Sequence, residues 1–201
     1  MKQIKLTVPD NWGDITVRQY QQFMEIMESN KREKTKTLEM VSLFCGVNKK
    51  LLKDMAFGDL QKVSNILIQM TKEDPSDIKM VKNITFKNES FGVIPNMSEM
   101  TTGEFIDLET YCEDSTKNLH NIMSILYRKQ MGDINMFGRY EVESYDPTDA
   151  KKEAMKDLPM NYALGVLNFF FSLGEKLLRD LSNSLNPQTS SKTKEKKRKG
   201  E

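Results

Sequence analysis

The side chains best suited to chemistry in this sequence are its single histidine, His120, and a cluster of acidic residues. Neighbouring carboxylates can bind Mg²⁺ or divide acid and base roles between them. The cluster occupies the first turns and the polar side of a predicted helix, where the helix dipole favours acids. We therefore interpret these residues as a solvated helix face: Glu104, Asp107, Glu109, Glu113 and Asp114.

His120 lies directly after Leu119 and shortly before Ile122 on a predicted amphipathic helix. One histidine with no nearby cysteine or second histidine does not provide the usual zinc ligand set. A general base also needs a nucleophile and an orienting carboxylate, which the sequence does not place beside it. We predict a histidine at the surface or at the boundary of the core.

Motifs for phosphate binding or nucleophilic catalysis are absent from the sequence. It contains neither a G-x-x-x-x-G-K-[ST] loop nor a strand-linked G-x-G-x-x-G, and no G-x-S-x-G elbow. Cys45 and Cys112 lie in apolar helical patterns, so two buried free thiols in a reducing compartment are expected. We predict that the protein is not an enzyme and has no catalytic, cofactor or metal site.

The elements that must position these side chains are mostly helices, so an α+β fold with a mainly helical body and a small antiparallel sheet is expected. Thr16–Gln19 and Thr101–Glu104 each match a capping box, which marks a helix start. The second of these helices is expected to turn Phe105, Leu108 and Cys112 inward. The expected helices cover approximately residues 16–28, 38–45, 49–55, 59–74, 101–112, 116–128, 146–158 and 159–185.

Alternation of apolar and polar residues predicts the strands. Gln3–Val8 alternates, and Ile84–Phe86 and Phe91–Val93 flank a polar linker as in a β-hairpin. We expect the N-terminal strand to pair with this hairpin. A further strand is predicted at Tyr140–Tyr145, after a glycine-containing loop at Lys129–Arg139.

The long predicted helix at 159–185 carries an apolar seam whose members are spaced alternately three and four residues apart. Two interpretations stay open: the helix is the core of a monomer, or its part toward Leu178–Leu185 packs on another subunit. On the second interpretation, Phe171→Asp prevents folding, whereas Leu181→Asp blocks assembly only. The candidate partner-interface residues are Leu164, Leu167, Phe171, Leu178, Leu181 and Leu185.

Residues 187–201 are expected to form a disordered basic tail after a single domain at 1–186. The last ten residues hold six basic and two acidic side chains, whereas the whole chain has a net charge of +1. Such a tail either contacts nucleic-acid phosphates without sequence preference or only increases solubility. The candidate nucleic-acid contacts are Lys192, Lys194, Lys196, Lys197, Arg198 and Lys199.

Composition places the chain among soluble proteins of ordinary size. Hydrophobic residues make up 38% and charged residues 29% of 201 residues, enough for one core. The N-terminus shows no signal-peptide pattern. The longest apolar stretch, Ala163–Leu173, is shorter than the roughly 20 residues that span a bilayer. No membrane contact is expected.

Three parts of the sequence resemble small proteins from the structural-gene blocks of tailed bacteriophages, particularly crAss-like phages of gut Bacteroidota. They are Val8–Trp12 leading to Ile15–Tyr20, then Ile94–Leu108, and Asn118–Arg128. The resemblance extends in order over most of residues 1–185. It contains no catalytic motif, so it transfers no site residues.

The resemblance implies a non-enzymatic virion structural protein, found in the virion and, during assembly, in the host cytoplasm. A ring or adaptor subunit at the head–tail (portal or tail) region would bind portal or tail proteins and further copies of itself. Two alternatives remain. One is a tail or capsid assembly chaperone that is absent from the mature virion, and the other is an accessory protein that contacts DNA without sequence preference.

Overall fold

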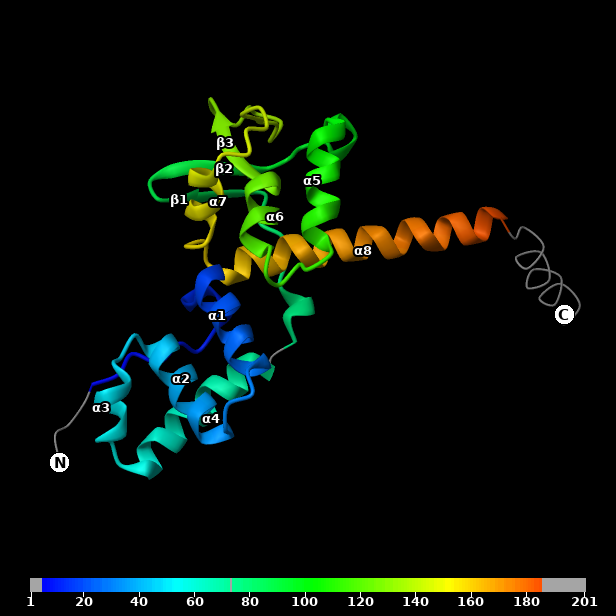
Figure 1. Cartoon of the computed structure of the whole chain (residues 1–201). Helices are drawn as coiled ribbons and strands as arrows, with labels where there is room; N and C mark the ends of the chain where they lie inside the picture. Colours follow the sequence, from blue (N-terminus) through cyan, green and yellow to red (C-terminus); the bar gives the residue numbers. More distant parts are fainter. Residues whose placement is uncertain (1–4, 73, 186–201) are drawn as a thin grey trace, which may run out of the picture.

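The computed structural model describes residues 5–72 and 74–185, with side chains described as far as Ser172. Over these ranges the fold is α+β, with eight α-helices and a four-stranded antiparallel sheet, which confirms the expected class (Figure 1). The predicted tail, 187–201, lies outside the described residues. The helices are α1 (Val17–Glu28), α2 (Glu33–Cys45), α3 (Lys49–Lys53), α4 (Phe57–Lys72), α5 (Thr102–Cys112), α6 (Leu119–Leu126), α7 (Asp149–Met155) and α8 (Met160–Leu185).

Two lobes meet at α1 and at the start of α8 (Figure 1). The helical lobe consists of α2, α3 and α4, and the sheet lobe consists of the strands with α5, α6 and α7. One continuous cluster of buried apolar side chains includes members from both lobes. Helix α8 begins in this core and then projects away from the body (Figure 1).

Both predicted capping boxes are present. The Thr16 hydroxyl accepts from the Gln19 backbone N–H at 3.2 Å, and the Gln19 side chain accepts from the Thr16 backbone N–H at 2.9 Å. Thr101 and Glu104 exchange the same two bonds at the start of α5. Each pair satisfies backbone N–H groups that the first helical turn leaves without partners.

The sheet is an antiparallel meander in the order β1-β2-β3-β4. Lys87 and Asn88 both have positive φ and form the two-residue turn of the predicted hairpin, which matches the twist of its strands. Strand β3 follows α6 without a loop. The strands are β1 (Asn83–Phe86), β2 (Glu89–Val93), β3 (Tyr127–Met131) and β4 (Glu141–Val142).

Three of the strand predictions need correction. Lys5–Val8 forms no strand, and the sheet has no N-terminal member among the described residues. Lys129–Met131, predicted to be loop, belongs to β3 and pairs with β2 and β4. The strand predicted at Tyr140–Tyr145 is only the two residues of β4.

Several helix predictions also change in detail. Helix α2 begins at Glu33, earlier than its apolar pattern, and α7 begins at Asp149 with Thr148 as its N-cap rather than Asp146. On α5 the predicted inward face is wrong for Cys112, which is exposed, and for Phe105, which is 59% exposed, whereas Leu108 is half-buried and packs against the core. The buried residue is instead Glu104, at 4% exposure.

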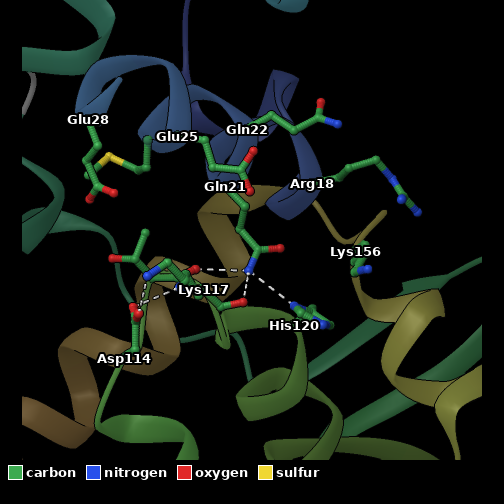
Figure 2. Close-up of a pocket in the computed structure, with 11 residues that line it drawn as sticks. Arg18, Gln21, Gln22, Glu25, Glu28, Asp114, Lys117, His120 and Lys156 are labelled. Carbon is green, nitrogen blue, oxygen red and sulfur yellow. Dashed lines mark hydrogen bonds and ion pairs between the residues drawn. The ribbon is translucent and has the colours of Figure 1, made fainter. Parts of the chain in front are cut away.

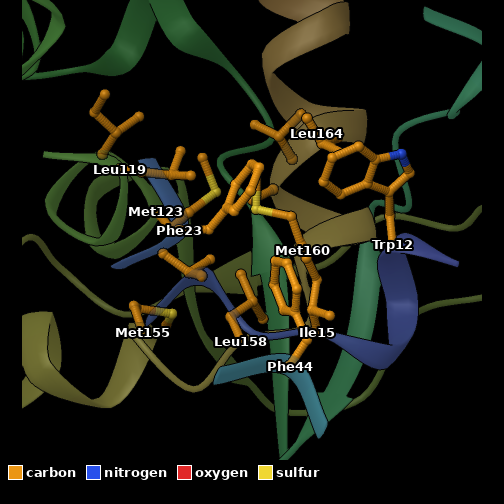
Figure 3. Close-up of a cluster of buried hydrophobic side chains, with 14 of the residues drawn as sticks. Trp12, Ile15, Phe23, Phe44, Leu119, Met123, Met155, Leu158, Met160 and Leu164 are labelled. Atoms are coloured by element: carbon orange, nitrogen blue, oxygen red, sulfur yellow. The ribbon is translucent and has the colours of Figure 1, made fainter. Parts of the chain in front are cut away.

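A short backbone ladder joins the start of α1 to the start of α8. The Val17 N–H donates to the Leu158 carbonyl and the Met160 N–H donates to the Ile15 carbonyl, each at 2.9 Å. Around this ladder pack the fully buried side chains of the lobe junction (Figure 3). The junction fixes the direction in which α8 leaves the body. Its labelled members are Trp12, Ile15, Phe23, Phe44, Leu119, Met123, Met155, Leu158, Met160 and Leu164.

Candidate functional site

A groove of about 1280 Å³ lies between the sheet lobe and α8. Its walls come from the segment 93–101 after β2, from the β3–β4 hairpin, and from α8 through Phe169 and Phe170. Glu104 and Arg128 belong to its lining although both are buried, so they form its floor. The groove therefore combines a charged floor with partly apolar walls.

The floor is held by a buried ion pair between α5 and β3. Arg128 Nη2 lies 2.6 Å from Glu104 Oε1, and both side chains are less than a tenth exposed. The angles at Arg128 Nη2 do not fit a hydrogen bond, so charge attraction holds the guanidinium and the carboxylate together. Arg128 Nε also donates to the Ile125 carbonyl at 3.0 Å, which satisfies an acceptor at the end of α6.

Tyr145 closes the other side of Arg128. The guanidinium carbon lies 5.4 Å from the centre of the Tyr145 ring, within cation–π range. The Tyr145 hydroxyl donates to Asp107 Oδ2 at 2.6 Å, and burial together with this bond raises the pKa of Tyr145. Every charge on the floor thus has a partner within the protein, as in a structural network.

Large apolar side chains are exposed at the tip of the β3–β4 hairpin. Met136 is 91% and Phe137 is 77% exposed, and Phe137 also lines the groove. Asn135 Oδ1 accepts from the backbone N–H groups of Phe137 and Arg139, each at 2.9 Å, and Gly138 has positive φ. The tip therefore has a defined turn that presents two apolar side chains to solvent.

Helix α8 is buried in its first two turns and exposed soon after. Leu164 is buried and Leu167 is half-buried, so the body already covers these two candidate interface residues. Phe171 is 64% exposed, which contradicts its predicted place in the core, and its role at an interface stays a prediction. The side chains of Leu178, Leu181 and Leu185 lie outside the described residues.

A second, smaller hollow of about 300 Å³ surrounds His120, between α1 and α6 (Figure 2). The Gln21 side-chain amide lies 3.1 Å from His120 Nδ1 and also donates to the carbonyls of Thr116 and Lys117. These contacts tie the α6 end of the chain segment 116–120 to α1. His120 is a half-buried boundary residue, as predicted.

The surroundings of His120 do not resemble a catalytic site. Burial lowers its pKa from 6.5 to about 4, with Lys156 adding to the shift. Asp114 is held by Lys117 at 2.8 Å instead of orienting the ring. The hydroxyl-bearing residue that lines this hollow is Thr116, whose backbone carbonyl accepts from Gln21. His120 joins α6 to α1 through its contact with Gln21.

The free energy of unfolding should decrease as the pH is lowered, because of His120. A histidine whose pKa is lower in the folded state binds protons mainly when unfolded between about pH 6.5 and 4, so unfolding is favoured as pH drops through that window. His120→Gln should lose less stability than the wild type between pH 7 and 4.5, as measured by urea midpoints. Equal losses in the two proteins would contradict this assignment.

The two cysteines and the acidic residues are the other groups that could take part in chemistry. Cys45 is half-buried and Cys112 exposed, so the prediction of two buried thiols is wrong for Cys112. Within residues 5–72 and 74–185, no group of three histidine, cysteine or acidic residues is placed to hold a metal ion.

The described helices include none long and apolar enough to cross a membrane. The candidate nucleic-acid contacts, Lys192–Lys199, lie outside the described residues.

Neither the charged floor of the groove nor the exposed hairpin tip was predicted from the sequence. The floor needs Glu104 and Arg128 to meet across 24 positions, and no local pattern indicates such a pairing. The hairpin tip had a signal in the sequence, because Ile134, Met136 and Phe137 are large apolar residues in a glycine-bounded turn. Clustered exposed apolar residues mark contact sites whereas single ones are common, so these three residues together are a candidate contact surface.

Comparison of the chain with protein-family models, with curated proteins and with solved structures finds no match. The physical features of the groove and of α8 are therefore the basis for assigning a function.

Proposed function

We propose that this protein is a non-enzymatic structural subunit of a tailed-phage particle, a ring or adaptor component at the head–tail region that acts through protein–protein contacts. The observation that carries the proposal is the exposure of Met136, Phe137 and Phe171 on two projecting elements. The resemblance of Ile94–Leu108 and Asn118–Arg128 to phage structural proteins supports the phage assignment.

Exposed aromatic residues and methionines favour a protein partner. Burying one such side chain contributes about 1.5–3 kcal/mol, so leaving three in water forgoes a large stabilisation. Aromatic residues and methionine are also enriched in protein interfaces, where charged residues form the rim. Arg139 and Glu141 follow the hairpin tip in the sequence and line the same groove. Charged residues beside an apolar tip are the arrangement expected at the edge of a protein interface.

The groove itself favours the second candidate, an assembly chaperone for a tail or capsid protein. A hollow of about 1280 Å³ with Ile94, Met97 and Phe169 in its lining offers apolar surface for a segment of a partner. A chaperone would hold that segment during assembly and leave before the particle matures. The two candidates therefore differ in what the finished particle contains.

Peptide mass spectrometry of purified particles separates the candidates. A structural subunit should be present in a fixed, stoichiometric number of copies, whereas absence from mature particles combined with presence in assembly intermediates would support the chaperone. Absence from both particles and intermediates would contradict both candidates.

The double variant Met136→Ser, Phe137→Ser should reduce incorporation into particles at least about tenfold, because truncating interface anchors typically costs 2 kcal/mol or more. Folding should be unchanged, since both side chains are exposed. Met27→Ser, an equally polar change at an exposed position on α1, is the control and should leave incorporation normal. Normal incorporation of the double variant would remove the hairpin tip from the proposed interface.

A further inference from the structure

The molecule carries opposite charge at its two ends. Residues 31–54 of the helical lobe contain seven Lys or Arg and three acidic residues, whereas residues 97–116 of the sheet lobe contain six acidic residues and no Lys or Arg. Figure 1 shows α3 at the outer end of the helical lobe and α5 on the far side of the sheet lobe. The two charged regions therefore point in different directions.

The basic end surface is formed by Lys50, Leu51, Lys53 and Phe57. Leu51 is 49% and Phe57 is 68% exposed. Both lysines are also exposed, and neither forms an ion pair with an acid of the described chain. Their neighbour Lys49, by contrast, is bound to Glu39 at 2.9 Å. The surface thus has two apolar side chains beside two lysines without an ion pair, and the exposed Asp54 at the end of α3 is the one acid next to them in the sequence.

The acidic face lies along the exposed side of α5 and is formed by Phe105, Ile106, Glu109 and Glu113. Phe105, Glu109 and Glu113 are four residues apart and so share one side of the helix. Both glutamates are exposed and without an ion-pair partner among the residues the structure describes. This face presents the counterpart of the basic end: two apolar side chains beside two uncompensated negative charges.

We infer that copies of this chain associate head to tail, with the basic end surface of one copy packed against the acidic face of the next. The inference rests on the proposed function, in which the chain is a repeated subunit. Lysines beside apolar side chains on one surface and glutamates beside apolar side chains on the other match the charge complementarity that selects protein partners. Because the two surfaces differ and lie on different lobes, the contact is heterologous and closes into a ring or continues as a filament.

Charge reversal in two separate proteins gives a sharp test. One variant carries Lys50→Glu and Lys53→Glu, so both of its surfaces are acidic, and the other carries Glu109→Lys and Glu113→Lys, so both are basic. Each variant alone should associate at least about tenfold more weakly than the wild type, because like charges then face each other. An equimolar mixture should recover association, since every contact in an alternating assembly is again between opposite charges.

Light scattering and sedimentation of the full chain over a concentration series measure these outcomes, with circular dichroism to confirm folding. Asp77→Lys with Asp133→Lys makes the same charge change at two exposed positions that belong to neither surface and should associate as the wild type does. Association of the wild type should also weaken at high salt, which screens exposed charges.

Three results would overturn the inference: a wild-type chain that stays monomeric at every concentration, reversed variants that still associate alone, or a mixture that fails to recover. None of these would refute the proposed function, which depends on the chain being found in particles. Conversely, a chain absent from particles that still associates in this charge-dependent way would refute the proposed function alone.

Discussion

Glu104→Gln is expected to lower the free energy of unfolding by about 3–5 kcal/mol, because breaking a buried ion pair leaves an uncompensated buried charge. In this protein the remaining charge would be the guanidinium of Arg128, whose side chain is 8% exposed. Contacts of Arg128 with the Ile125 carbonyl and the Tyr145 ring hold it in place, so it cannot easily turn to water. The same substitution keeps the size of the side chain, so the loss measures charge and not packing.

Urea unfolding followed by circular dichroism measures this loss. Glu109→Gln is the matched control, since it makes the same chemical change on the exposed side of the same helix and should cost less than about 0.5 kcal/mol. Replacing both partners, with Glu104→Gln and Arg128→Met together, should recover part of the loss because no buried charge then remains. A loss below 1 kcal/mol for Glu104→Gln would show that the pair is open to solvent.

This ion pair also explains why the predicted orientation of α5 is wrong at Phe105. The capping box at Thr101–Glu104 depends on residues three apart and was therefore predictable. Which face of α5 turns inward depends instead on Arg128, which lies in another element and draws Glu104 into the protein. Apolar Phe105 is left outside as a result. Local patterns give the helix, and a distant partner sets its orientation.

The strands show the same division between local and distant causes. The hairpin of β1 and β2 was predictable because its polar linker separates two alternating segments and its strands pair with each other. The segment Lys5–Val8 alternates equally well, yet it joins no strand of the sheet, and Leu6 and Val8 pack against the apolar core instead. Strand β3 shows no alternation that separates it from a loop, and pairing on both sides determines its conformation.

For α8, the sequence predicted the helix but not the point at which the body stops covering it. That point is set by the segment that includes Ile78, which packs across the helix. Asn168 Nδ2 donates to the carbonyls of Pro75 and Ile78, and a side chain at Gly165 would collide with the Lys79 carbonyl. Beyond this crossing Phe169 and Phe171 are exposed. The candidate interface is therefore the surface of α8 after Asn168, and not its whole apolar seam.

Two aspartate substitutions on α8 should have opposite effects on folding. Val166→Asp places a carboxylate at a position with no exposure within the apolar core cluster, so it should cost more than about 4 kcal/mol and leave the chain largely unfolded. Phe171→Asp, five residues later on the same helix, should change the unfolding free energy by less than about 0.5 kcal/mol, as is usual for an exposed position.

The variants are a matched pair, because each introduces the same side chain into the same helix and only the surroundings differ. Urea midpoints give the effect on folding, and co-purification with particles gives the effect on assembly. Phe171→Asp should yield a folded protein that fails to enter particles, since an aspartate cannot replace an apolar anchor in a buried contact. A Phe171→Asp chain that is unfolded would mean that α8 folds back on its own body in solution. One that is folded and incorporated normally would mean that no partner covers this part of α8.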